Sequence, residues 1–557
     1  MQKEWRVLAN KAKNIVDKLL SNRNIDYKDK KARERFFNPD YDRDSHDPFL
    51  MKGMKKAVER IKKAIKNNEK IGIFGDYDVD GICSSFILYD FFEKVGLEKY
   101  IYLPDRHKEG YGLNLNAIKY FKEQKVNLII TTDCGSSNYN EVEDANKKGF
   151  DVIITDHHEV PQKTPRAFAI LNPKQKDCHY PMRDLSGAGV AFKLAQALRK
   201  KIKHKNITEA WEKRLLDLVG FATTTDQMPL LDENRMLVYF GLKVIRKTHR
   251  LGLYYLIKVS RVKKDSIDTY DLLFALGPRI NTAGRIEHAS IAFNLFTART
   301  NKEAEDIAKI LDETNRRRQS IVESNMRSIK KRLENKKLGS VVFEVDKEWK
   351  PGMLGLLASK VQEDYGLPTF ICYEDKDKVK CSTRTGHNFD SVAAIKKAEK
   401  YMTSWGGHKP AAGFTTKKEF LSLIEKIFIK ESKKLKPEDL KPVINIDAEI
   451  EPEDINMELW NILQKIGPYG QKNTEPIFVM RNVEIKSARK VGSKEKHFKL
   501  EFCKNNIVLG GIFFNGVKNN NLAYGHKVDI AFKICLNEWN NMRKLEFNII
   551  DFKECKM

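Results

Sequence analysis

Three carboxylates stand at alternate positions directly after a short apolar run. Residues 71–74 are typical of a buried strand, and residues 82–92 predict the helix that follows it. The loop between them carries Asp76, Asp78 and Asp80. Open α/β folds place their ligands at the carboxyl edge of the sheet, where such a loop lies. Because anions this close repel one another unless a cation holds them, the segment indicates a divalent-metal site. A solvated turn or a helix cap would carry the same residues.

Three later apolar runs also end in an acid, one of them followed by a histidine pair. The runs and their ends are 128–132 with Asp133, 152–155 with Asp156-His157-His158, and 215–222 with Asp226. We expect all four runs to be strands that deliver their polar ends to one edge of one sheet. Imidazole beside carboxylate favours Mn²⁺, Fe²⁺ or Zn²⁺ over Ca²⁺. A histidine pair alone is more often structural, but four equivalent clusters indicate a metal centre.

These segments resemble the four ordered motifs of the DHH phosphoesterase superfamily. The matching stretches are Asp-Tyr-Asp-Val-Asp-Gly at 76–81, Asp-Cys-Gly at 133–135, Asp-His-His at 156–158 and Thr-Asp at 225–226. Further stretches are similar to signatures of the RecJ family of single-strand-specific 5′→3′ exonucleases. They lie at 103–106, 109–112, 277–285, 349–352, 382–385 and 406–413. The matches follow family order over most of the chain.

The chain is too long for one core, and its pattern predicts an α/β protein of several domains. Alternating strands and helices predict a parallel sheet, apolar spacing over 302–337 predicts a long helix, and short strands near the end suit a small barrel. With the resemblance, we expect an N-terminal helical extension (1–50), a parallel-sheet DHH catalytic domain (51–300), a connecting helix (301–338), a smaller α/β DHHA1 domain (339–435) and a C-terminal OB-like β-barrel (436–557). The extension should contain one helix near 7–20 and pack against the catalytic domain.

The net positive charge of the chain indicates a polyanionic partner. Lysine and arginine exceed aspartate and glutamate by 25 among 557 residues, which favours phosphate neutralisation, although AT-rich coding contributes to the excess. Eight cysteines without a CxxC pair argue against a zinc ribbon or a disulfide framework. No apolar stretch is long enough for a membrane span or a signal core, so we expect no membrane partner and a cytoplasmic monomer.

The resemblance implies a catalytic centre with two divalent ions, Mn²⁺ preferred and Mg²⁺ second. In that arrangement one ion is held by Asp76 and Asp78, the other by Asp80, His157 and Asp226, and Asp133 bridges both. The catalytic residues implied are Asp80, Asp133 and His158. His158 would face the substrate, where it stabilises phosphoryl charge or protonates the leaving oxygen, and Asp156 would orient a histidine.

The resemblance also implies a set of residues that bind the substrate. They are Arg106, Arg279, Asn281, Ser382, Arg384 and His408. A planar guanidinium binds phosphate oxygens bidentately, and Ser382 with Arg384 would close a pocket for the 5′ end. Arg285 suits an internal ion pair almost equally well. Lys350 replaces a family histidine, and Cys381 and Thr383 replace two family glycines, which stiffens the loop around this pocket.

The barrel segment offers two interpretations. Basic residues between 486 and 499 lie near Phe498 and Phe502, which suits a platform that follows strand phosphates and stacks on bases. Because Phe498, Leu500 and Phe502 alternate, they share one face of a strand and equally suit the barrel core.

The function implied is a 5′→3′ exonuclease that degrades single-stranded DNA to mononucleotides in DNA repair and recombination, with a helicase and a single-strand-binding protein as partners. One alternative is a phosphodiesterase of short oligonucleotides or cyclic dinucleotides, but such enzymes are commonly shorter and lack the barrel. Another is a non-catalytic DNA-binding scaffold, which predicts eroded motifs, whereas all four are intact here. RNA hydrolysis stays open because phosphate contacts do not read the 2′-OH.

Overall fold

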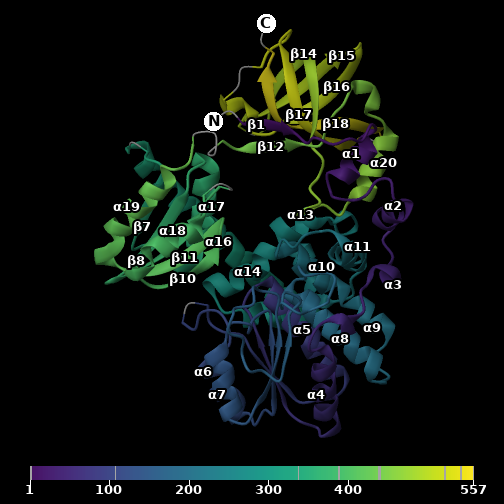
Figure 1. The fold of residues 1–557 in the computed structure, drawn as a ribbon. Coiled ribbons are helices and arrows are strands. Elements are labelled where there is room, and N and C mark those ends of the chain that lie inside the picture. Colours follow the sequence, from purple (N-terminus) through teal and green to yellow (C-terminus); the bar gives the residue numbers. More distant parts are fainter. Residues whose placement is uncertain are drawn as a thin grey trace.

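The structure, a computed structural model, places three bodies around one another (Figure 1). The residues it describes are 3–106, 108–336, 338–386, 389–436, 441–492, 494–519, 522–539 and 542–555. Within these ranges, no helix is long and apolar enough to cross a membrane. The larger sheets are a parallel sheet, a mixed sheet and a barrel, which confirms the predicted fold class.

The catalytic domain is built on a parallel sheet of order β3-β2-β4-β5-β6. Its strands are β2 (Ile71–Gly75), β3 (Lys99–Tyr102), β4 (Leu128–Thr132), β5 (Asp151–Thr155) and β6 (Ala169–Leu171). All residues of β2 and β4 are buried, as expected for parallel strands that helices cover on both faces. One face carries α6 (Leu115–Glu123) and α7 (Tyr139–Lys147), and the other carries α4 (Met54–Lys66), α5 (Val79–Lys94) and α8 (Gly187–Lys201) (Figure 1).

The fourth apolar run is a helix, so the prediction of a strand there is wrong. The helices that follow the sheet are α9 (Glu209–Arg214), α10 (Leu216–Thr225), α11 (Asp232–Arg246), α12 (Leu251–Ser260), α13 (Thr269–Asp271), the π-helical turn η3 (Leu272–Leu276), α14 (Gly277–Ile286) and α15 (Ser290–Thr297). Helix α10 packs against α5, α8 and α11 and is almost fully buried. A helix buried on all sides has no polar face, and periodicity alone therefore does not distinguish it from a buried strand.

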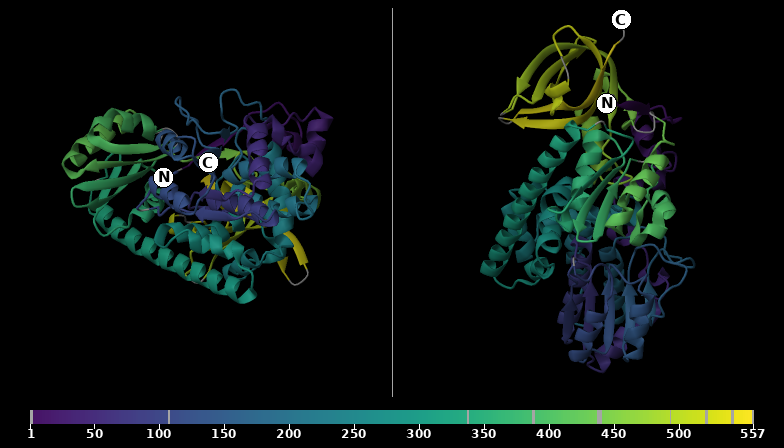
Figure 2. Two further views of the ribbon diagram at one scale, coloured as in Figure 1. Left: turned by 90° about the horizontal axis from the view of Figure 1, so that it is seen from below. Right: turned by 90° about the vertical axis from the view of Figure 1, so that its left-hand side faces the viewer.

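A long helix, α16 (Asn301–Glu334), joins the catalytic domain to the second α/β body (Figure 2). That body has a sheet of order β10-β11-β9-β8-β7, in which only β7 and β8 run parallel. Its elements are β7 (Val342–Asp346), α17 (Leu354–Tyr365), β8 (Thr369–Asp375), β9 (Lys378–Arg384), α18 (Ser391–Ala398), β10 (Met402–His408), β11 (Ala411–Lys417) and α19 (Leu421–Ser432). A disulfide joins Cys372 to Cys381, which face each other across β8 and β9.

The C-terminal body is a β-barrel, which is closed by pairing between β14 and β17. Its elements are β12 (Val443–Ile446), β13 (Ala448–Glu449), α20 (Met457–Ile466), β14 (Phe478–Val491), β15 (His497–Lys504), β16 (Ile507–Phe513), β17 (Lys527–Trp539) and β18 (Met542–Glu554). Strand β14 is continuous but has a register shift between Met480 and Val483 where it pairs with β17. Phe498, Leu500 and Phe502 are buried in the barrel core, so they do not form a base-stacking surface.

The N-terminal extension packs on the catalytic domain, as expected, and also on the C-terminal body. It consists of β1 (Glu4–Val7), α1 (Ile15–Ser21), α2 (Lys30–Phe37) and α3 (Tyr41–Asp44). Strand β1 pairs in parallel with β12, and Leu19, Leu20 and Phe36 are buried in the core of the C-terminal body. Tyr41 lies in the catalytic core. The extension therefore ties the barrel to the catalytic domain.

Candidate metal centre

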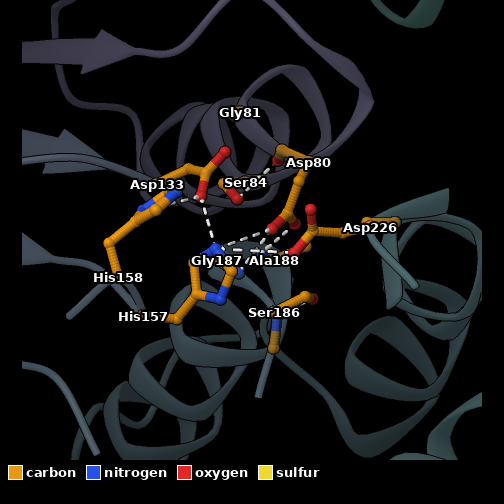
Figure 3. A network of polar contacts seen from close by, with 12 residues as sticks. Asp80, Gly81, Ser84, Asp133, His157, His158, Ser186, Gly187, Ala188 and Asp226 are labelled. Carbon is orange, nitrogen blue, oxygen red and sulfur yellow. Dashed lines mark hydrogen bonds and ion pairs between the residues drawn. The ribbon is translucent and has the colours of Figure 1, made fainter. Parts of the chain in front are cut away.

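Loops from three strands and one helix meet at the carboxyl edge of the parallel sheet (Figure 3). Asp76 follows β2, Asp78 caps the N-terminus of α5, and Asp80 lies in the first turn of that helix. The other polar ends are Asp133 after β4, His157 and His158 after β5, and Asp226 at the C-terminus of α10. The structure thus brings together every residue that the motifs predict as a metal ligand.

His157 lies at the centre of this cluster. Its Nε2 is 3.1 Å from Asp133 Oδ1, 3.5 Å from Asp226 Oδ2 and 3.6 Å from Asp80 Oδ2. Three sets of side chains have ligand atoms within 4.8 Å of one another. The sets are Asp76-Asp78-Asp133, Asp80-His157-Asp226 and Asp133-His157-His158. Asp133 and His157 each belong to two sets, as residues between two adjacent ions would.

The charge state of the cluster fits divalent cations. Burial, with repulsion from neighbouring acids, raises the pKa of Asp80 to about 7 and that of Asp226 to about 9, and it raises the pKa of Asp133 well above its usual value. Asp76 Oδ1, Asp133 Oδ1 and Asp226 Oδ2 are buried and accept no hydrogen bond. Burial lowers the pKa of His157 to about 3, which keeps its imidazole neutral and able to coordinate. Carboxylates and imidazole suit Mn²⁺, and Mg²⁺ accepts the same carboxylates.

The raised pKa values predict how stability depends on pH. Below about pH 4 these carboxyl groups are protonated in both states, but between that pH and their raised pKa values only the folded protein keeps the protons. The melting temperature of the EDTA-treated protein should therefore fall from about pH 5 to pH 9. The rise in melting temperature on adding Mn²⁺ should grow over the same interval, because the cation competes with protons.

Thermal unfolding across this pH range, with EDTA and with Mn²⁺, measures both trends. An Asp80→Asn/Asp226→Asn double variant is the matched comparison, since it should flatten the fall of the metal-free protein. A melting temperature without metal that rises over the interval would contradict the predicted sign.

The N-terminus of α8 binds one of the carboxylates. The amides of Gly187 and Ala188 donate to Asp80 at 2.6 and 2.7 Å, and the positive end of the helix dipole stabilises this anion. A Cβ at Gly187 would lie 2.6 Å from Asp133 Oδ1, so the site requires glycine there. Sequence reasoning missed these residues. The available signal was Ser186, an N-cap residue directly before Gly187.

Two residues hold His158 in place. Asp156 Oδ1 accepts from the His158 amide and lies 2.9 Å from His158 Nδ1, and Tyr111 Oη is also 2.9 Å from this nitrogen. Burial lowers the pKa of His158, but the hydrogen bond and charge of Asp156, together with the charges of Asp80 and Asp76, outweigh burial and raise it. Tyr111 also donates to the Asp133 carbonyl at 3.1 Å. With Nδ1 engaged, His158 keeps Nε2 for other partners.

Arginines from separate elements lie near one another beside the metal cluster. Burial, followed by Arg106, Arg318 and Arg384, lowers the pKa of Arg285 to about 9. Burial and Arg106 likewise lower the pKa of Arg384. Arg106 also acts on Asp76, so the cationic group adjoins that end of the cluster.

Strand β9 presents one face to this group. Ser382 Oγ lies 3.3 Å from an Arg384 nitrogen, and Lys380, Ser382 and Arg384 alternate along the strand and so share a face. Arg384 pairs in register with Ala411, which pairs with His408 on β10. Residues paired across strands point to the same side, so exposed His408 lies on the face that carries Arg384.

Arg279 borders this group through Arg318, whose pKa is lowered by burial and then by Arg279, but the Arg279 guanidinium is also held by an acid. Its guanidinium forms an ion pair with Asp312 at 2.8 Å and donates to the Ala275 carbonyl, which joins α14 to α16. Arg285, which lies on the same helix, donates to the Gly352 carbonyl at 3.3 Å and lies near Arg106 and Arg384. Asn281 accepts from the Val79 amide at 3.0 Å and thereby supports the aspartate-rich loop.

Family models match three regions of the chain. They are described as the DHH family N-terminal domain over 70–223, the DHHA1 domain over 337–432 and the RecJ OB domain over 446–551. The single-stranded-DNA-specific exonuclease RecJ from Haemophilus influenzae is 32% identical over 91% of this chain and 91% of its own length. RecJ from Escherichia coli is 31% identical over 90% of this chain and 90% of its own length. The Bacillus subtilis RecJ is 36% identical over 93% of the chain, which spans 65% of that relative's length.

Solved structures show the same architecture. RecJ from Thermus thermophilus in complex with Mn²⁺ superposes with a TM-score of 0.84 at 24% identity, over 100% of this chain and 80% of that one. A structure of exonuclease RecJ bound to manganese has a TM-score of 0.60 at 27% identity, over 69% of this chain and 96% of that one. The chain belongs to the RecJ family.

Proposed function

We propose that the protein is a metal-dependent exonuclease that degrades single-stranded DNA from the 5′ end to mononucleotides. The observation that carries this proposal is the carboxylate–histidine cluster with a group of arginines at one end, since the two together suit a phosphodiester near a strand terminus. The names of the relatives, single-stranded-DNA-specific exonucleases, support the substrate class. The manganese complexes of related structures support the cofactor.

The ligand sets suit two divalent ions, Mn²⁺ first and Mg²⁺ second. Asp76 and Asp78 would hold one ion, Asp80, His157 and Asp226 the other, and Asp133 both. Bound cations of this kind neutralise charge on the phosphoryl group and make water a nucleophile near neutral pH. The chain's own part is to keep Asp133 and His157 at short distance in a buried site, so that little reorganisation is needed when substrate arrives.

The remaining residues orient the strand and move a proton. Arg106 and Arg285 would bind phosphate oxygens beside the cluster, and Ser382 with Arg384 would bind a terminal phosphate. His158, fixed through Nδ1, would stabilise phosphoryl charge or protonate the leaving oxygen. A pocket that accepts only a strand end makes cleavage exonucleolytic.

We assign the activity to DNA repair and recombination in the cytoplasm, with a helicase and a single-strand-binding protein as partners and a monomer as the active form. These assignments rest on the family resemblance. Co-purification with a helicase and sedimentation of the pure protein test them.

A time course with Mn²⁺ tests the activity. Single strands labelled separately at the 5′ and 3′ ends should release mononucleotide from the 5′ label first, and duplexes should resist. Release only from dinucleotides or cyclic dinucleotides would assign the chain to the small-nucleotide phosphodiesterases. No release from any substrate would indicate a scaffold.

Arg384→Ala should remove the preference for a phosphorylated 5′ end. Charge-assisted hydrogen bonds of the kind Arg384 offers are worth about ten- to hundredfold in binding, so kcat/KM on 5′-phosphate strands should fall by that factor while 5′-hydroxyl strands change little. Competition between the two strand types measures the preference. Arg299→Ala is the control, because Arg299 is exposed and pairs with Glu93 on the outer surface. An unchanged preference would remove Arg384 from the pocket.

A further inference from the structure

Arg106 is held by an aromatic ring rather than by an acid. Its guanidinium carbon lies 4.7 Å from the centroid of the Tyr77 ring. Among the described residues no carboxylate forms an ion pair with Arg106, whereas Arg279 is paired with Asp312. A cation over an aromatic face is attracted by the π electrons, and this contact uses none of the N–H donors of the guanidinium. The donors of Arg106 are therefore available to an anion.

Helix α14 fixes the residue that carries the ring. A Cβ at Gly284 would lie 2.7 Å from the Tyr77 carbonyl oxygen and 3.3 Å from Tyr77 Cβ, so the helix packs directly on this residue. Asn281, on the same helix, accepts a hydrogen bond from the Val79 amide at 3.0 Å. The ring itself is partly buried against the catalytic core. Tyr77 is thus held through its main chain and its side chain, and it gives Arg106 a fixed support.

The supported guanidinium lies beside the metal cluster. Tyr77 stands between Asp76 and Asp78, which belong to one ligand set with Asp133. Burial and Asp78 raise the pKa of Asp76, and the charge of Arg106 opposes this rise. An anion that is drawn to this end of the cluster would therefore meet the free N–H donors of Arg106.

We propose that Tyr77 is a positioning residue, whose ring orients Arg106 so that the guanidinium binds a phosphate oxygen of the strand at the metal cluster. This inference rests on the proposed function and adds to it a residue that acts through another side chain. Asp76 and Asp78 supply metal ligands on either side of the ring. One loop, fixed by one helix, thus places a group that binds cations and a group that binds an anion.

Binding without hydrolysis tests the arrangement. The full-length protein in EDTA is titrated into fluorescent 5′-phosphorylated oligothymidine, and anisotropy gives the Kd. Tyr77→Leu keeps an apolar side chain but removes the ring, so the Kd should rise by about two- to thirtyfold, the range that cation–π contacts cover. Tyr77→Phe should bind as the wild type, because it keeps the ring and the Tyr77 hydroxyl has no hydrogen-bond partner among the described residues.

A double-mutant cycle decides whether Tyr77 acts through Arg106. Arg106→Ala should weaken binding at least as much as Tyr77→Leu does. In the Arg106→Ala protein, Tyr77→Leu should then raise the Kd by less than about twofold. Equal losses from Tyr77→Leu in both backgrounds would overturn the inference, because independent contributions add. Tyr77→Met gives the same cycle if the leucine variant unfolds.

The rise in melting temperature on adding Mn²⁺ separates this role from support of the metal ligands. Tyr77→Leu should keep the rise of the wild type, because Asp76 and Asp78 remain. A rise that is lost in Tyr77→Leu but kept in Arg106→Ala would show that the ring supports the ligand loop instead, and it would overturn the inference. Equal melting temperatures in EDTA verify that the fold is kept.

Tyr100→Leu is the matched control. Tyr100 is also a partly buried tyrosine, and Lys70 Nζ lies 5.5 Å from its ring centroid. It pairs in register with Gly72, in the amino-terminal half of β2 and away from the edge that carries the cluster. Its removal should leave the Kd within about twofold and the response to Mn²⁺ unchanged.

No arm of these experiments reads hydrolysis, so the inference and the proposed function fail separately. Coupled losses at Tyr77 and Arg106 in a protein that degrades nothing would refute the nuclease proposal and keep the role of Tyr77. Independent losses in an active nuclease would refute the role of Tyr77 alone.

Discussion

Replacing Asp133 with asparagine is expected to reduce kcat on single-stranded DNA by about 10³-fold or more. Asp133 is shared by two of the three ligand sets, and its Oδ1 is 3.1 Å from His157 Nε2. An amide keeps the shape of the side chain but loses the charge that two adjacent cations need. The backbone at Asp133 has φ of 61°, a conformation that asparagine tolerates better than most residues, so the fold should persist.

Single-turnover kinetics with Mn²⁺ measure the effect on the chemical step, and equilibrium binding of the same strand measures the effect on affinity. Binding of the strand should be retained, because the substitution leaves the arginines and the barrel unchanged. Removing a negative charge also adds no repulsion toward phosphate. Asp177→Asn serves as the control, since Asp177 is exposed and pairs with Lys52. Normal turnover by the Asp133→Asn protein would exclude a bridging carboxylate.

The sequence predicted the parallel sheet well because its strands are buried on both faces. Ile71–Gly75 and Leu128–Thr132 are continuous apolar runs, and few other structures explain such short runs between helices. The same reasoning failed at Leu216–Thr225, where burial on all sides removes the helical period. Position in the motif order still identified Asp226 correctly as a neighbour of the cluster.

The sequence alone did not predict contacts between distant segments of the chain. Glu4 pairs with Val443 in β1 and β12, and no local pattern in a polar extension reveals a partner so far along the chain. Cys372 and Cys381 likewise become neighbours only when β8 and β9 pair.

The sequence predicted which residues lie at the site better than it predicted what each of them does there. Arg279 and Arg285 stand on one short helix, and either could have met phosphate. The two arginines differ in their partners, because Asp312 of α16 pairs with Arg279, whereas Arg285 donates to the Gly352 carbonyl. Gly187 was missed for a similar reason, because its importance lies in the close approach of its backbone to Asp80 and Asp133.

The second large effect is expected at His158. His158→Gln should lower kcat by about 10²- to 10⁴-fold, the usual contribution of a positioned acid or base, while the Mn²⁺ concentration that gives half-maximal rate changes little. The reason is that the two histidines have different partners. His157 lies within 3.6 Å of three carboxylates, whereas Nδ1 of His158 is engaged by Asp156 and Tyr111.

Two matched variants make this comparison decisive. His157→Gln should shift the Mn²⁺ dependence strongly, because it removes a residue common to two ligand sets. Tyr111→Phe should cost less than about tenfold, because it removes the hydroxyl contacts to His158 and to the Asp133 carbonyl but leaves Asp156 in place. The measurement is the rate of 5′ mononucleotide release as Mn²⁺ is titrated for each protein. If His158→Gln shifts the Mn²⁺ dependence as far as His157→Gln does, His158 is a metal ligand and its role in charge stabilisation or protonation is refuted.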